Sequence, residues 1–245
     1  GSAADAVAWR FADLAAEDRR AEAVDAVLRS IERDTDDLLL AMSGTSALVE
    51  PDGTVSQAAL DRYATDLAAG GAARPLVLMS PVGADDPAPA GSWQVRLAAV
   101  GTEPDPGPAD GTDALDGLDV GRVLGPDASL ATAATSARER GRPTIGRVDS
   151  GSGGRLVVVK PLYLVGQHDP EFIGVVASAD LPGQLPSRIA TDVPADVRFR
   201  ISDGDTVLAG SDPAPAAGTS TETVAGGRLL SVSVEDARPV NHDLS

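Results

Sequence analysis

The first forty residues carry apolar side chains with a seven-residue period. One row consists of Val7, Leu14, Ala21, Leu28, Thr35 and Met42, and a second row of Val24, Ile31 and Leu38 accompanies it. This spacing predicts one long α-helix with an apolar stripe, about 60 Å in length at a rise of about 1.5 Å per residue. The stripe has two interpretations. It either packs the helix on its own domain, or it pairs a stalk with a second copy of the chain.

Further along the chain, apolar runs and turn residues predict a mixture of helices and strands. A turn at 51–53 separates the first helix from a second one at 56–69, and another helix over 129–140 stops at Gly141. Strands are expected at 75–81, 93–100, 144–148, 156–164, 172–178, 197–202, 206–209, 219–224 and 228–234. Helices combined with antiparallel hairpins predict an α+β fold.

Composition narrows the classes of function. The chain has 245 residues, of which 42% are hydrophobic and only 3% aromatic, so Val, Leu, Ile and Ala must form most of the core. Its net charge of −17 argues against binding to nucleic acid, which requires clustered Lys and Arg. The absence of cysteine excludes disulfides, thiolate metal sites and a cysteine nucleophile. No apolar run of about 18 residues is present to span a membrane.

Few residues offer catalytic chemistry. The two histidines, His168 and His242, stand in a loop and in the terminal tail, without the spacing of a metal site. No G-x-S-x-G elbow occurs, and the glycine-rich segment 149–154 is interpreted as a hairpin turn because it lacks the Lys-Ser/Thr ending of a phosphate loop. We therefore expect no enzymatic activity, no metal and no cofactor. A distant pair of carboxylates, as in glycosidases, leaves no local trace and stays open.

Segments in the middle of the chain resemble the CHASE family of extracellular sensory domains. The similar segments are 116–120, 125–127, the helix end 137–145, the strand 154–163 with its Pro-x-Tyr ending, and 172–176, with 74–82 in the place of the first core strand. The resemblance implies a long N-terminal stalk helix followed by two PAS-like antiparallel-sheet subdomains. It also implies the extracytoplasmic part of a receptor in the cell membrane, with a histidine kinase or nucleotide cyclase as its output.

This resemblance divides the chain into four parts. Residues 1–44 form the stalk helix, 45–185 the membrane-distal ligand-binding domain, 186–238 a smaller membrane-proximal domain, and 239–245 a tail leading to a removed membrane helix. The expected partners are an unknown small molecule and a second copy of the chain, which pairs through the stalk helix. No nucleic-acid partner is expected, and the full-length protein would be anchored in the membrane.

The expected ligand site lies on the concave face of the distal sheet. It consists of small and apolar positions on two neighbouring strands: Thr144, Gly146, Val148, Val157, Val159 and Pro161. Alternate residues of a strand share a face, and Lys160 would be costly in a closed core, so Val157 and Val159 are expected to face inward. The same valines would equally serve as ordinary core packing.

Two other classes of function stay open. A surface protein-interaction module would have a filled distal domain without a pocket for a small molecule. An extracytoplasmic hydrolase would bring carboxylates together in a cleft, with at least one perturbed pKa. The resemblance favours the sensor.

Overall fold

The computed structural model describes residues 3–71, 73–83, 86–101, 115, 118–150, 153–164, 169–180, 184–215, 219–225 and 228–236, with the side chains of 3–13, 150, 219, 225 and 236 excepted. Both histidines, the tail 239–245 and part of the segment 116–120 lie outside these residues. The chain divides into two compact units. Unit 1 comprises residues 1–33, 184–224 and 229–245, and unit 2 comprises residues 34–183 and 225–228.

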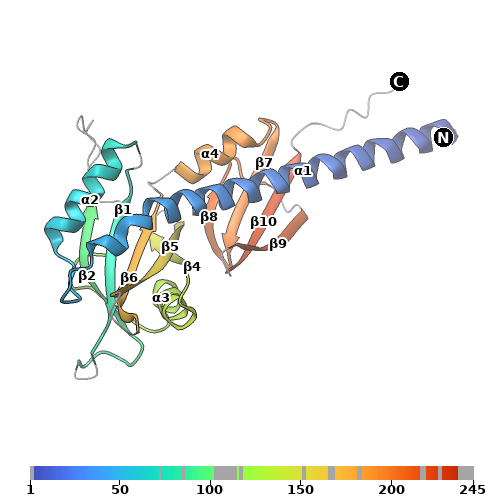
Figure 1. The fold of residues 1–245 in the computed structure, drawn as a ribbon. Helices are drawn as coiled ribbons and strands as arrows, with labels where there is room; N and C mark the ends of the chain where they lie inside the picture. The colour runs from blue at the N-terminus through green and yellow to red at the C-terminus, as the bar shows by residue number, and fades with distance from the viewer. Residues whose placement is uncertain are drawn as a thin grey trace. The chain divides into compact units, whose positions relative to one another are not determined.

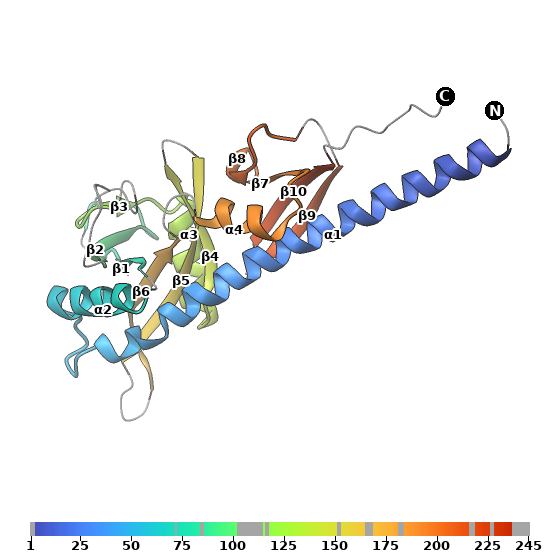
Figure 2. The same cartoon turned by 90° about the horizontal axis from the view of Figure 1, so that it is seen from above.

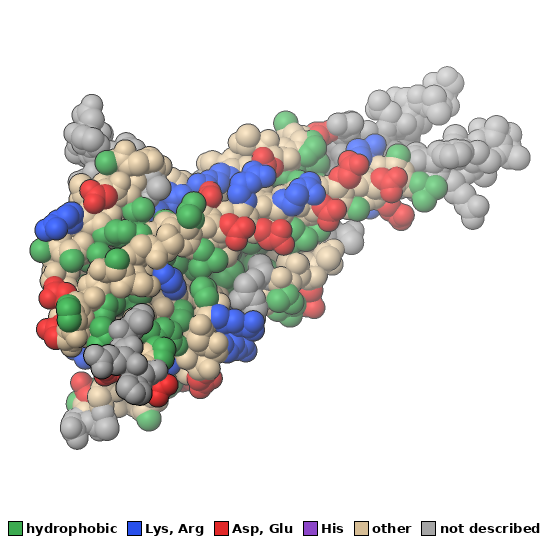
Figure 3. Space-filling view, viewed as in Figure 1, with side chains coloured by type: hydrophobic (Ala, Val, Ile, Leu, Met, Phe, Trp, Pro, Cys, Tyr) green, Lys and Arg blue, Asp and Glu red, His purple; other side chains and the backbone are tan. Residues whose placement is uncertain are grey.

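The N-terminal helix α1 (Ala3–Ala41) has the predicted length, and its residues up to Arg33 belong to unit 1. Acidic and basic side chains are interspersed along its exposed side (Figure 3). Its buried side chains follow a three- and four-residue spacing: Ala23, Ala26, Val27, Ser30, Ile31, Asp34, Leu38 and Ala41, and the buried Met42 follows directly after the helix. The predicted stripe positions Ile31, Leu38 and Met42 are thus packed on their own chain. Pairing of the helix with a second copy stays a prediction.

Unit 2 is built on a six-stranded antiparallel sheet with the order β3-β2-β1-β6-β5-β4 (Figure 1). The strands are β1 (Pro75–Pro81), β2 (Trp93–Val100), β3 (Val123–Leu124), β4 (Thr144–Ser150), β5 (Gly153–Leu164) and β6 (Glu171–Ala179). The central strands β1 and β6 pair Leu76 with Ser178. Both strands are apolar on both faces, as expected where helices cover the two sides of a sheet.

Helices pack on both faces of this sheet (Figures 1 and 2). The helix α3 (Ser129–Arg140) covers one face with Leu130 and a row of alanines, and it ends at Gly141, whose φ of 63° is left-handed. The helix α2 (Gln57–Ala69), capped by the Ser56 side chain, contacts β1 and β2, and the short 3₁₀ helix η1 (Ser43–Leu48) contacts β5. Because α3 is rich in alanine, its backbone approaches the sheet closely.

Unit 1 contains a four-stranded antiparallel sheet with the order β8-β7-β10-β9. Its elements are α4 (Gln184–Asp192), β7 (Val197–Asp203), β8 (Thr206–Gly210), β9 (Thr219–Ala225) and β10 (Arg228–Asp236). The sequence did not predict α4, which is short and carries Pro186 in its first turn, where proline is tolerated. It did not predict the two-residue strand β3 either.

The predicted α+β class is confirmed: a long N-terminal helix precedes two antiparallel sheets. The strands expected at 75–81 and 93–100 and the helix expected at 129–140 have their predicted ends. Among the described helices, including the long α1, none has a stretch apolar enough to cross a bilayer.

Candidate ligand-binding site

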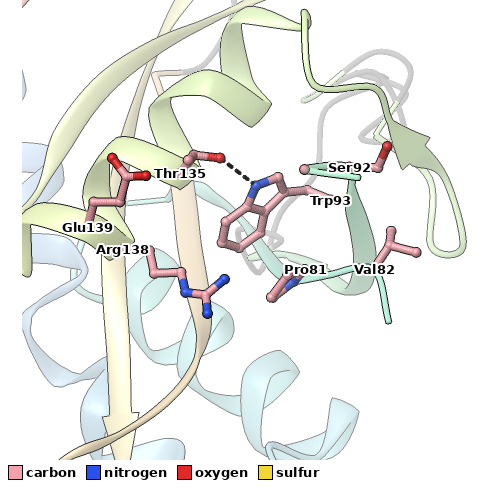
Figure 4. A pocket seen from close by; sticks show the side chains of 8 residues that line it. Pro81, Val82, Ser92, Trp93, Thr135, Arg138 and Glu139 are labelled. Carbon is pink, nitrogen blue, oxygen red and sulfur yellow. Dashed lines mark hydrogen bonds between the residues drawn. The ribbon is translucent and has the colours of Figure 1, made fainter. Parts of the chain in front are cut away.

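A cavity of about 500 Å³ opens in unit 2 between the end of α3 and the hairpin of β1 and β2. Its lining consists of Pro81, Val82, residues 91–93, Thr135, Arg138 and Glu139 (Figure 4). Pockets for small molecules generally have volumes of about 300–1,000 Å³ and a few polar groups within an apolar lining. The size and the mixed lining of this cavity suit a small molecule.

Trp93 is the largest side chain of the lining, and only 2% of it is exposed. It begins β2, where it pairs with Pro81 of β1 and Leu124 of β3. Its indole Nε1 donates a hydrogen bond of 3.0 Å to the Oγ1 of Thr135 on α3 (Figure 4). A buried indole N–H requires such an acceptor, so this bond fixes the ring against the helix.

Three aromatic rings gather beside the cavity in a chain that has only two Trp, two Tyr and three Phe. Phe172 at the start of β6 makes edge-to-face contacts with Trp93 and Tyr163, at centroid distances of 6.2 and 5.6 Å. The guanidinium of Arg138 lies 5.1 Å from the centre of the Phe172 ring. This cation–π contact holds the Arg138 side chain over the aromatic group.

The two charged residues of the lining point in different directions. Arg138 and Glu139 are neighbours on the last turn of α3. Figure 4 shows the Arg138 guanidinium on the side of Trp93 and Pro81, whereas the Glu139 carboxylate points away from them. Both residues line the cavity, and Arg138 is the one whose charge lies on the side of Trp93.

Ser92 also belongs to the lining of the cavity. Its carbonyl accepts a hydrogen bond from the Val82 N–H, which holds the two strands together at the cavity. Its hydroxyl is buried and has no hydrogen-bond partner among the described residues, and in Figure 4 it points away from the Trp93 ring. The Ser92 hydroxyl therefore takes no part in the hydrogen bond between Trp93 and Thr135 or in the contact between Arg138 and Phe172.

The six residues expected from the sequence lie together under α3, but none of them lines this cavity. Val148, Val157 and Val159 belong to the apolar core, and the latter two are 0% exposed, facing inward as predicted. The Thr144 hydroxyl donates a hydrogen bond of 2.8 Å to the Ala133 carbonyl. A Cβ on Gly146 would come within 2.9 Å of the Ala133 Cβ. Pro161 is also buried. In this structure the alanines of α3 pack against these positions. The role of the six predicted residues in ligand binding stays a prediction.

Sequence reasoning missed Trp93 and Arg138 as site residues. Trp93 had a usable signal, since it is one of only two tryptophans and it opens a predicted strand in an aromatic-poor chain. Arg138 had none, because an arginine near a helix end is usually explained by the helix dipole. Only the tertiary structure shows that Phe172, 34 positions later, lies under its guanidinium.

On the opposite face of β5, Lys160 is bonded to the end of α1. Its Nζ donates hydrogen bonds of 2.9 Å to the Met42 carbonyl and 3.2 Å to the Ser43 carbonyl. The Tyr63 hydroxyl of α2 donates a bond of 2.6 Å to the Ala41 carbonyl of the same helix end. Partial burial lowers the pKa of Lys160. Carbonyls at the end of a helix lack partners within the helix, and the Tyr63 hydroxyl supplies one for Ala41. At Met42, Lys160 adds a donor to the N–H and hydroxyl of Thr45.

Carboxylates with shifted pKa values lie outside the cavity. The pKa of Asp52 is lowered by hydrogen bonds from Thr54, and the pKa of Asp192 by a hydrogen bond from Ser30 and by Arg33. Both carboxylates are exposed, so neither has the raised pKa of a buried general acid. Within the described residues, no group of three or more His, Asp or Glu is placed to hold a metal.

Comparisons with known proteins show a likeness of fold. No protein-family model matches the sequence, and no curated protein matches it either. The structure of Methyl-accepting Chemotaxis protein X aligns with a TM-score of 0.54 and 13% identity, over 92% of this chain and 98% of that one. The periplasmic domain of Vibrio cholerae LuxQ aligns with a TM-score of 0.51 and 11% identity, over 89% and 99%. The chain thus shares the fold of these two bacterial proteins, and no family model singles out CHASE.

Proposed function

We propose that this chain is the extracytoplasmic sensor domain of a bacterial membrane receptor, of the CHASE type or a close variant, and that it binds a small molecule without catalysis. The observation that carries the proposal is the cavity at Trp93 and Arg138, in a sheet whose opposite face is bonded to α1. Its fold likeness to the LuxQ periplasmic domain and to a chemotaxis protein supports the extracytoplasmic location.

The connection to α1 supplies a route for a signal within unit 2. The strand β5 presents Val159 to the α3 face and Lys160 to the other face, where it holds the carbonyls of Met42 and Ser43. A ligand that changes the position of α3 on the sheet would change how β5 holds the end of α1. Such a change requires that the ligand binds one of the two arrangements more tightly than the other.

The proposed homodimer uses the part of α1 that the fold leaves uncovered. Leu14 is 54% exposed and Ala21 is also exposed, whereas Ile31, Leu38 and Met42 are buried within the chain. The contact between two copies would therefore involve the N-terminal half of the predicted stripe, next to the expected membrane anchor. The domain limits predicted from the sequence, 1–44, 45–185, 186–238 and 239–245, remain part of this proposal.

A metabolite screen by thermal denaturation tests the sensor function. A ligand at about 100 times its Kd stabilises a protein by about 2.7 kcal/mol, so a true ligand raises the Tm measurably. Val82→Phe enlarges a residue of the cavity lining and should abolish this rise. Val120→Phe is the matched control, since Val120 is 59% exposed and does not line the cavity.

The alternative is a surface protein-interaction module. It predicts that no metabolite raises the Tm, or that Val82→Phe leaves every such rise unchanged. Either result would contradict the sensor proposal.

A further inference from the structure

We infer that the ligand of this cavity is a small anion, and that the guanidinium of Arg138 binds its negative group. The inference rests on the proposed sensor function and names the chemical class of the ligand.

Arg138 is held in place by an aromatic group. Its guanidinium carbon lies 5.1 Å from the centre of the Phe172 ring, and Phe172 is itself held by edge-to-face contacts with Trp93 and Tyr163. Among the described residues, none accepts a hydrogen bond from the Arg138 guanidinium, so its N–H donors remain available for a ligand. The aromatic group therefore orients Arg138 without occupying the atoms that would bind an anion.

No negative charge is paired with Arg138 among the described residues. The adjacent Glu139 points away (Figure 4), and the rest of the lining is uncharged. In a chain with a net charge of −17, this leaves an oriented cation at a cavity. Carboxylate and phosphate groups match the geometry of a guanidinium with two parallel hydrogen bonds.

The remaining lining of the cavity indicates what the rest of the ligand is like. The Trp93 N–H is already bonded to Thr135, so the tryptophan offers the ligand an apolar ring and no donor. Pro81 and Val82 extend this apolar surface. A small organic acid with an apolar body satisfies both parts of the lining.

Arg140 provides a matched control, because it lies on the same last turn of α3 and is likewise exposed. Both arginines complement the negative end of the helix dipole. Only Arg138 lines the cavity. A contribution of the dipole alone would make the two residues equivalent.

The experiment uses tryptophan fluorescence. Trp9→Phe leaves Trp93 as the only tryptophan, so its emission reports on the cavity. The probes are small carboxylates and organic phosphates with apolar bodies, each paired with its neutral amide or alcohol. We expect the acids to bind about tenfold or more tightly than their neutral partners, as charge-assisted hydrogen bonds imply. Arg138→Gln should weaken acid binding about tenfold or more. Arg138→Lys should weaken it less, and Arg140→Gln should leave it unchanged.

The outcomes separate this inference from the sensor function. If neutral or cationic probes bind more tightly than the acids, or if folded Arg138→Gln binds the acids as the parent does, the anion inference is overturned and the sensor function stands. If no probe and no metabolite changes the Trp93 emission or the Tm, both proposals fail. The relative affinities of carboxylates and phosphates identify which acid the cavity accepts.

Discussion

The ammonium group of Lys160 lies 2.9 Å from the backbone carbonyl oxygen of Met42, to which it donates a hydrogen bond across 118 positions of sequence. Lys160 is the only lysine of the chain. The bond joins a strand of the unit 2 sheet to the end of the longest helix. The same carbonyl, which directly follows α1, also accepts hydrogen bonds from the Thr45 N–H at 3.1 Å and the Thr45 hydroxyl at 2.7 Å.

Lys160→Met should destabilise the protein by about 0.5–1.5 kcal/mol, because it keeps the length of the side chain and removes the ammonium donor, while the Met42 carbonyl keeps its hydrogen bonds from Thr45. Urea denaturation measures the effect. Lys160→Arg, which keeps a cationic donor, should cost less. A Lys160→Met protein as stable as the parent would show that water replaces the ammonium group at no cost.

Tyr63→Phe should cost about 1–2 kcal/mol, because the hydroxyl both donates to the Ala41 carbonyl at 2.6 Å and accepts from the Gly44 N–H at 3.2 Å. Tyr163→Phe is the control, since its hydroxyl makes only an exposed contact of 3.5 Å. Free energies of unfolding of the two variants give the comparison. Equal losses would mean that the Tyr63 hydroxyl does not stabilise the end of α1.

Thr135→Val should destabilise the protein by about 1–3 kcal/mol, because it preserves the shape of the side chain but leaves the buried Trp93 N–H unpaired. In the Trp9→Phe background, the Trp93 emission should shift as well. Thr132→Val on the same helix is the control, since the Thr132 hydroxyl is exposed and bonds only to backbone carbonyls. A larger loss for Thr132→Val would contradict the assigned role of Thr135.

Arg74 and Asp180 form a buried ion pair of 3.1 Å, with side-chain exposures of 7% and 9%. They continue the pairing of the central strands β1 and β6, in which Leu76 opposes Ser178. Asp180→Leu should cost about 3–5 kcal/mol, because it leaves the Arg74 charge buried and unpaired. The double variant Arg74→Met/Asp180→Leu should be more stable than Asp180→Leu alone. Strictly additive losses in this double-mutant cycle would exclude a coupled pair.

Acid should weaken unit 1 through Asp192. A hydrogen bond of 2.7 Å from the Ser30 hydroxyl is the main cause that lowers the pKa of Asp192, with Arg33 contributing. A carboxyl whose folded-state pKa lies below its unfolded value stabilises the fold above that value, about 3.9, and this stabilisation is lost as the pH falls. The stability difference between the parent and Ser30→Ala should therefore shrink below about pH 4. For Ser43→Ala, at an exposed site, the difference should not depend on pH. Denaturation at several pH values provides both curves, and a Ser30→Ala difference that stays constant would refute the linkage.

The sequence by itself determined the local elements of this protein. The apolar period of α1, the Ser56 cap of α2, the Gly141 stop of α3 and the apolar runs of β1 and β2 are local signals, since each depends on backbone preference and on the spacing of neighbouring side chains. They gave the α+β class. Val157 and Val159 lie in the core under α3, but Val158 on the other face of β5 is buried as well, so alternation alone did not distinguish the two faces. Such patterns indicate which side of a helix or strand is buried, but they do not indicate which other segment packs on that side.

Only the tertiary structure decided what covers each face and where a cavity remains. The face under α3 that the sequence predicted as the ligand site is filled, because Ala133 and its neighbours bring the helix close to Gly146. The cavity opens instead at the end of α3, where Trp93, Arg138 and Phe172 meet from three separate segments. Contacts between segments that are distant in the sequence also bury one side of the helix α1. They determine which of its apolar positions pack within the chain and which stay exposed.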